Sequence, residues 1–260
     1  MKIQVKQSTL VDILNYLYVD GLFPFSVITI KNGNLISSQS EKDDFVYRYV
    51  SFDKQCFTSI SQEQETIKID VEKVKRFAQV RGPDDIITLE YNPDKMDNKL
   101  IISDKDGMDK IALITVDDNE KDVSIPFKIK DNVPYLNNGE VPLDTHLVVG
   151  LNAFKKLSTF SSIHGTDFYR FKINKNDRKF NVLVGDIHEI EDSSIRYPTC
   201  KVYSVNEDLD VIFTKGLKEI TKVFTSDVHM NLRSNMPGWF KEITKEHKFG
   251  VMITPYIKKD

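Results

Sequence analysis

The sequence predicts an α+β protein of two similar domains, each with two helices packed on antiparallel sheets. Apolar residues spaced three apart recur in four segments, a spacing typical of helices with one buried face. They are Val11, Leu14 and Leu17; Val74, Phe77 and Val80; Phe154, Leu157 and Phe160; and Leu217, Ile220 and Val223. The second segment follows the first by 63 residues, the fourth follows the third by 63, and 143 residues separate the two pairs. This spacing indicates a duplicated domain whose copies are themselves roughly duplicated.

The residues that follow the second and fourth helices support the duplication. Four residues after the second helix match four after the fourth at the same offset of 143: Asp84, Ile87, Leu89 and Asn92 match Asp227, Met230, Leu232 and Asn235. Any amphipathic helix contains apolar triplets, so the triplets alone are weak evidence. The inference of a duplicated domain depends on the match between the residues that follow the helices.

The first domain is expected to span residues 1–117. Its predicted strands are 2–6, 26–31, 45–51, 66–69, 86–91, 99–103 and 110–116. Tight turns separate several of them, as at Asn32-Gly33-Asn34 and at 104–107, since Asn, Asp and Gly tolerate the backbone angles that such turns require.

The second domain is expected to span residues 143–260. Its predicted strands are 146–149, 168–173, 181–186, 199–204, 210–213, 228–233, 240–244 and 249–256. An interdomain connector, 118–142, lies between the domains. Its apolar residues Val123, Ile125, Phe127 and Ile129 alternate with polar ones, the period of an extended strand with one apolar side. We expect that side to cover the domains, to offer a docking edge to a partner, or both.

Composition indicates a soluble globular protein, with 40% hydrophobic and 29% charged residues over 260 positions. The first ten residues suggest a strand rather than a signal peptide, and no apolar run is long enough to span a bilayer. Cys56 and Cys200 are widely separated and are expected to be reduced. We therefore expect an intracellular protein.

Positive charge is concentrated on three of the four helices. Segments 71–81, 151–161 and 214–224 carry nine basic and two acidic residues, a net +7, which leaves −10 for the rest of a chain whose net charge is −3. With the apolar triplets facing the sheets, these basic residues emerge on the opposite side. The candidate residues for a contact surface are Lys73, Arg76, Lys155, Lys156, Lys215, Lys218 and Lys222.

These basic faces admit two interpretations. They are either ordinary solvated helix surfaces or a contact surface for a phosphate backbone, and the shared sign in repeated units favours the second. With no aromatic residues among them, the contact would read no sequence and stack no bases. We found no Walker loop, nucleophile elbow, dinucleotide fingerprint or zinc-helix motif. The sequence therefore predicts no catalytic residue, no metal site and no cofactor, and a protein that is not an enzyme.

Several short segments, taken in order along the chain, resemble the DNA sliding clamps, of the proliferating cell nuclear antigen kind and their phage counterparts. They are 82–89 (GPDDIITL), Ser124-Ile125-Pro126, Thr221-Lys222, Met236-Pro237 and 253–257 (ITPYI). The resemblance covers essentially the whole chain. It implies a clamp fold that forms a head-to-tail ring, usually a trimer, around double-stranded DNA without reading its sequence. It also implies a DNA polymerase and other clamp-binding peptides as partners, and a clamp loader ATPase.

The resemblance also assigns residues. Arg76, Lys156 and Lys222 match basic residues that line the channel of the family. The partner pocket falls on Phe45, Val123, Ile125, Pro126, Pro237, Met252 and Pro255, whose simplest other role is packing beneath the connector. The subunit seam would use unpaired strand edges near 110–116 and 180–185.

Two features depart from the family. The first helix has Asp12 and Asn15 on its polar face with only Lys6 nearby, and the chain is less acidic than such clamps usually are. These features leave open a non-ring protein-interaction scaffold, or a monomeric or heteromeric relative of the clamps without catalytic activity. A metal-dependent nuclease is a third and weaker alternative.

Overall fold

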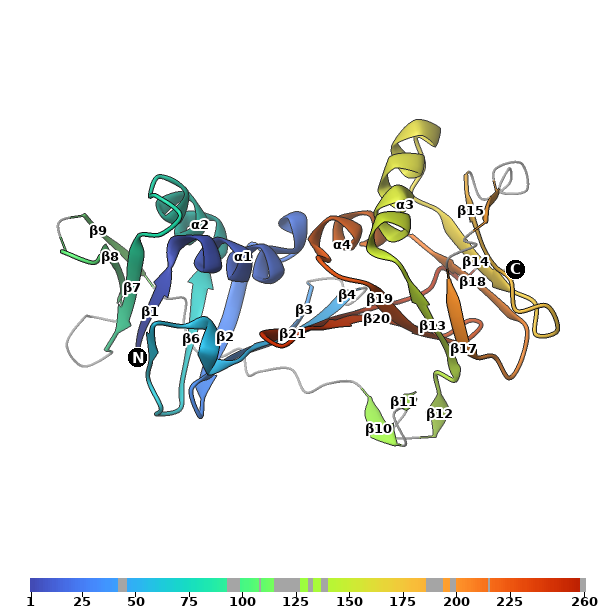
Figure 1. The fold of residues 1–260 in the computed structure, drawn as a ribbon, viewed down its shortest axis with the longest axis horizontal. Coiled ribbons are helices and arrows are strands. Elements are labelled where there is room, and N and C mark those ends of the chain that lie inside the picture. The colour runs from blue at the N-terminus through green and yellow to red at the C-terminus, as the bar shows by residue number, and fades with distance from the viewer. Residues whose placement is uncertain are drawn as a thin grey trace. The chain divides into compact units, whose positions relative to one another are not determined.

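The computed structural model describes residues 1–41, 46–92, 99–107, 109–114, 127–130, 133–136, 140–185, 194–196, 200–214 and 216–257 (Figure 1). The chain divides into two compact units. Unit 1 comprises Met1–Gln39, Arg48–Val123 and Thr244–Phe249, and unit 2 comprises Ser40–Tyr47, Ser124–Ile243 and Gly250–Asp260. In the described residues each unit carries two α-helices and antiparallel strands, so the predicted α+β class is confirmed.

The first half of the chain alternates strands with two helices. Its elements are β1 (Lys2–Lys6), α1 (Gln7–Tyr18), η1 (Val19–Gly21), β2 (Phe25–Lys31), β3 (Asn34–Ser40), β4 (Val46–Phe52), η2 (Lys54–Cys56), β5 (Ser59–Ile60), β6 (Glu65–Asp70), α2 (Val71–Gln79), β7 (Ile86–Tyr91), β8 (Lys99–Asp104) and β9 (Lys110–Ile114). One antiparallel sheet has the order β5-β1-β7-β8-β9, and β2 pairs with both β3 and β6.

The second half follows a similar plan. Its elements are β10 (Lys128–Lys130), β11 (Val133–Leu136), β12 (Val141–Pro142), β13 (Thr145–Val149), α3 (Leu151–His164), β14 (Tyr169–Ile173), β15 (Phe180–Val184), β16 (Ser194–Arg196), β17 (Lys201–Ser204), β18 (Leu209–Phe213), α4 (Leu217–Val223), β19 (Val228–Leu232), β20 (Gly238–Ile243) and β21 (His247–Ile253). In unit 2, β16-β15-β14-β18 form one antiparallel sheet and β17-β13-β19-β20 pair in a second.

The four helices bury most of the predicted apolar positions. On α1 both Leu14 and Leu17 are buried, and on α4 the whole predicted triplet is buried. The prediction is wrong for the end of α2. That helix ends at Gln79 and buries Val71, Val74 and Ala78, while Val80 is 72% exposed. The buried stripe of α2 therefore precedes the predicted one by a few residues.

The predicted turn at Asn32 and Gly33 joins β2 to β3. Both residues have positive φ, 53° and 77°, and Lys31 pairs with Asn34 across the turn. Two central residues with positive φ define the two-residue hairpin turn for which Asn-Gly is preferred. This turn was recognised from the sequence, but the strand after it was not.

The strand edges differ from the predicted seam in one place. β9 lies at the end of its sheet, as expected for an edge strand. The prediction of an unpaired edge near 180–185 is wrong, because β15 pairs with β14 on one side and with β16 on the other. Within the described residues, β16 is therefore the edge of that sheet.

The described part of the connector is only partly covered. Phe127 packs against Trp239, with ring centroids 4.7 Å apart. Ile129, expected on the same apolar side, is 64% exposed on β10. Ile129 therefore does not cover the domains, and the other expected role, a docking edge for a partner, stays a prediction.

Candidate nucleic-acid interface

In unit 1 the helices α1 and α2 lie side by side, and α2 carries the positive charge (Figure 1). Lys73 and Arg76 are both exposed. Each is ion-paired on its own helix or its cap: Lys73 Nζ lies 3.1 Å from Asp70, and Arg76 pairs with Glu72 one turn earlier. Exposed ion pairs of this kind contribute little free energy, so both cations can exchange a carboxylate for a phosphate.

The neighbouring helix α1 adds no comparable charge, as the sequence indicated. Asp12 is exposed on α1, and no Lys, Arg or His lies between residues 7 and 18. Lys6, just before the helix, pairs with Asp84 at 3.1 Å. Of the two helices of unit 1, only α2 therefore contributes positive charge.

In unit 2 the helices α3 and α4 lie side by side, and both carry lysines (Figure 1). Lys155 and Lys156 are exposed on α3, and Lys222 is exposed on α4. Lys218 is half-buried, with Nζ 3.7 Å from Asp167. Lys215 lies outside the described residues. Six of the seven predicted residues can thus be located, and in each unit they lie on a packed pair of helices.

Lysine and arginine on such faces can contact phosphates, and phosphate contacts carry no sequence information. An ammonium group is a point charge on a flexible stem, so it follows a phosphate backbone without a fixed hydrogen-bonding geometry. Contact of this kind is salt-dependent and independent of sequence.

The predicted partner residues can be located only in part. Phe45, Val123, Ile125 and Pro126 lie outside the described residues. In unit 2, Met252 and Pro255 are buried, whereas Pro237 is half-buried. The first two could therefore only form the floor of a pocket, and the partner site stays a prediction.

Two exposed apolar residues follow this group and were not predicted as site residues. Tyr256 is 39% exposed and Ile257 is 61% exposed, directly after Pro255. The backbone N–H of Tyr256 donates to the Ile212 oxygen at 2.8 Å, and its ring packs edge-on against Phe168. The run 253–257 was visible in the sequence, but the exposure of its last two residues was not.

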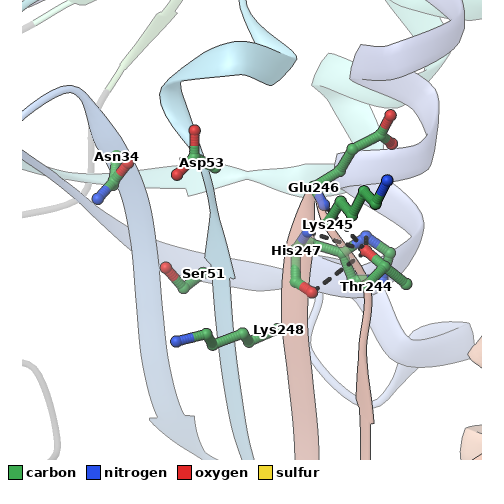
Figure 2. Close-up of a pocket in the computed structure, with 8 residues that line it drawn as sticks. All are labelled: Asn34, Ser51, Asp53, Thr244, Lys245, Glu246, His247 and Lys248. Atoms are coloured by element: carbon green, nitrogen blue, oxygen red, sulfur yellow. Dashed lines mark hydrogen bonds between the residues drawn. The ribbon is translucent and has the colours of Figure 1, made fainter.

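A polar pocket of about 130 Å³ lies in unit 1 around the turn before β21 (Figure 2). It is lined by Asn34, Ser51, Asp53, Thr244, Lys245, Glu246, His247 and Lys248. Several of its polar atoms hold local structure. Thr244 Oγ1 accepts the backbone N–H groups of Glu246 and His247 at 3.2 and 3.0 Å, and the side chain of Asp53 accepts the Gln55 N–H at 3.1 Å. We therefore assign the pocket to the packing of a turn.

The fold of the chain is that of the sliding clamps of the PCNA type. The structure of PCNA from Entamoeba histolytica matches with a TM-score of 0.78 and 12% identity over 98% of each chain. That of A. fulgidus PCNA bound to the C-terminal region of FEN-1 matches with a TM-score of 0.73 and 17% identity over 100% of this chain and 99% of that one. PCNA from Thermococcus kodakaraensis matches with a TM-score of 0.71 and 14% identity, covering 98% and 99%.

Similarity is found in three dimensions rather than in sequence. No protein-family model matches the chain, and no curated protein matches it in sequence. In the part of the chain that the structure describes, no helix is both long and apolar enough to cross a membrane.

Proposed function

We propose that this protein is a DNA sliding clamp, a processivity factor that encircles duplex DNA and tethers replication proteins to it. The proposal depends on one observation: α2, α3 and α4 carry exposed basic residues in a protein whose fold is of the PCNA type. Such residues hold DNA through its phosphates, so no contact depends on sequence and the ring can slide.

The clamp would act as a topological tether and would catalyse no reaction. Three chains joined head to tail would form the ring, a DNA polymerase and other proteins would dock through short apolar peptides, and an ATP-driven loader would open it. The structure of A. fulgidus PCNA with the C-terminal region of FEN-1 supports the peptide partners by analogy. The protein would work wherever DNA is replicated, in a cytoplasm, a nucleoid or a nucleus.

Charge reversal tests the channel. Lys156→Glu with Lys222→Glu should reduce primer extension by a clamp-dependent polymerase without unfolding the protein, because both side chains are exposed. Lys175→Glu is the matched control, since Lys175 is exposed in the loop after β14 rather than on a helix. Equal primer extension by the wild type, the double variant and the Lys175→Glu control would contradict the assignment of Lys156 and Lys222 to the DNA channel.

Molecular mass tests the ring. Light scattering should give about 90 kDa for three chains of 30.0 kDa each. The absence of basic residues on α1 favours a second candidate, a non-ring interaction scaffold or a monomeric or heteromeric clamp relative. A persistent 30.0 kDa monomer that fails to stimulate a polymerase would support that candidate.

A further inference from the structure

Two histidines distant in the sequence meet on one face of a sheet in unit 2. His146 on β13 and His229 on β19 lie opposite to the face that buries the paired residues Leu147 and Met230. His146 Nε2 is 3.5 Å from His229 Nδ1. The ring planes are 19° apart and the ring centroids are 5.7 Å apart.

The distance between the two nitrogens fits a shared metal ion better than a direct hydrogen bond. Hydrogen bonds from N–H groups have donor–acceptor distances of about 2.7–3.2 Å, shorter than the 3.5 Å found here. Two zinc–nitrogen bonds of about 2.0–2.1 Å at a tetrahedral angle would place their nitrogens about 3.4 Å apart. The two imidazoles already stand at the spacing of a chelate.

Both imidazoles are accessible and favour the neutral form that binds metals. Each ring is half-buried, so solvent can reach it. Burial lowers the pKa of His146, and the neighbouring His229 and Lys241 lower it further. Burial and then Lys241 lower the pKa of His229, while Asp227 opposes this effect.

The surroundings hold His146 in place and add an oxygen acceptor. The Tyr203 ring stacks on His146 with centroids 4.9 Å apart. Asn231 pairs directly with His146 across the strands and is only 2% exposed. Its Nδ2 donates to the Leu143 oxygen at 3.4 Å, whereas its Oδ1 accepts no hydrogen bond from the residues that the structure describes.

We propose that His146 and His229 form a solvent-open chelate for a divalent transition-metal ion of the zinc and copper class. Among the described residues no group of three or more His, Cys, Asp or Glu could hold a metal, so the protein supplies two nitrogens and water completes the coordination. For nitrogen ligands affinity is expected to be higher for Cu²⁺ than for Zn²⁺. The site is independent of the proposed clamp function.

Lys241, a neighbour of the proposed metal site, provides a second test of it. Lys241 on β20 pairs directly with His229. Its positive charge would repel a metal ion held by the two histidines. Lys241→Met should therefore increase metal affinity, a result that a purely structural role for the histidines does not predict.

The experiment uses the full-length protein without a histidine tag. Zn²⁺ binding is measured by calorimetry, and Cu²⁺ binding by quenching of Trp239, the only tryptophan in the chain, which pairs with Asn231 on β20. We expect one saturable site. His146→Ala and His229→Ala should each weaken binding by about tenfold or more, and the exposed His164→Ala should leave it unchanged.

Folding is checked by the melting temperature without metal, and binding by the rise in melting temperature that metal causes, since a ligand of the native state stabilises it. If His229→Ala fails to fold, His229→Gln is used in its place. Wild-type affinity in both histidine variants, or no saturable binding at about 1 mM Zn²⁺, would overturn the proposal. Neither readout requires DNA, so failure here leaves the clamp proposal unaffected.

Discussion

Asp70 contacts Lys73 twice at the start of α2. Its carboxylate accepts the backbone N–H of Lys73 at 3.0 Å and pairs with the ammonium group at 3.1 Å. The first contact is an N-terminal cap, which satisfies a backbone donor that the helix cannot pair internally. The second is an exposed ion pair between residues three apart. One carboxylate thus both begins the helix and neutralises a predicted DNA contact.

Two substitutions of Asp70 separate these roles. Asp70→Ala should lower the free energy of unfolding by about 1 kcal/mol, because the cap is lost. Asp70→Asn retains a capping oxygen and loses only the ion pair, so its stability should stay near that of the wild type. Urea denaturation followed by circular dichroism measures both. Equal destabilisation by the two substitutions would assign the effect to the ion pair instead.

The helices were predictable because their buried faces follow a period that the sequence shows. Leu14, Leu17 and Ile220 were placed correctly by spacing alone. Val80 was not, since an apolar residue just beyond the last turn has the same spacing as one inside the helix. Nothing in the spacing shows that α2 ends at Gln79.

Glu242 fixes the segment that follows α4. It is fully buried on β20, and its carboxylate accepts the N–H groups of Thr225 and Ser226 at 2.9 and 2.8 Å. Glu242→Ala should destabilise the protein by about 3 kcal/mol, since two backbone donors lose a carboxylate acceptor. Glu242→Gln retains the shape and one acceptor and should lose less. A guanidinium titration measures the difference, and a wild-type midpoint for the alanine variant would exclude this role.

Both cysteines should be unreactive in the folded protein. Burial, with Glu246 and Asp53 adding to it, raises the pKa of Cys56 to about 11, and burial raises that of Cys200 to about 12. The thiolate is the reactive form, so at pH 8 alkylation should be over about a hundredfold slower than in urea, where the pKa is about 8.5.

The pH dependence of alkylation follows from the raised pKa values. Between pH 8 and 10 the thiolate fraction of the native protein, and with it the rate, should rise about tenfold per pH unit. Iodoacetamide labelling followed by mass spectrometry measures the rate for each cysteine. Similar native and urea rates at pH 8 would show that the thiols are not held in their protonated form.

Strand β3 was missed because two of its three buried side chains, Ser37 and Ser38, are polar. Arg48 is fully buried in unit 1, and it donates to Ser37 at 2.5 Å and to Ser26 at 3.1 Å. A buried guanidinium requires acceptors around it. The hydrophobic period cannot reveal a strand whose inward side chains serve an arginine.

The two candidate sites also differ in how far the sequence alone could predict them. The basic residues of α2 and α3 were predictable because each helix shows its own polar face. His146 and His229 lie 83 residues apart, and only the pairing of β13 with β19 brings them together. Strand pairing between distant segments has no local signal in one sequence. Of the partner pocket, four residues lie outside the described structure, so the assignment by resemblance stays a prediction.

Salt dependence tests the phosphate contacts directly. Each lysine that contacts a phosphate should contribute about 0.9 to the slope of log affinity against log salt concentration. Lys156→Gln should therefore lower that slope by about 0.9 on any duplex, and Lys175→Gln should not. Fluorescence anisotropy with two unrelated duplexes of equal length measures both. A loss of affinity on only one duplex would indicate recognition of bases.

Gly250 lies against the ring of Trp239 with no space for a side chain. A Cβ on Gly250 would stand 2.2 Å from the Trp239 ring, far inside contact distance. Trp239 is 5% exposed and packs on Phe127, so its ring cannot move without disturbing the described part of the connector. Gly250→Ala should therefore destabilise the protein by about 1–3 kcal/mol and shift the emission of its only tryptophan.

Gly150→Ala is the matched control. Gly150 has a φ of −60°, and the nearest atom to its added Cβ is Asp227 Oδ1 at 3.9 Å. The substitution should leave the emission unchanged, because the methyl group meets no atom at close range. Gly150 is the N-cap of α3, where alanine is less favourable than glycine, so a small loss of stability is expected. If Gly250→Ala also left the emission unchanged and lowered the stability no more than Gly150→Ala does, the contact with Gly250 would not hold the Trp239 ring in place.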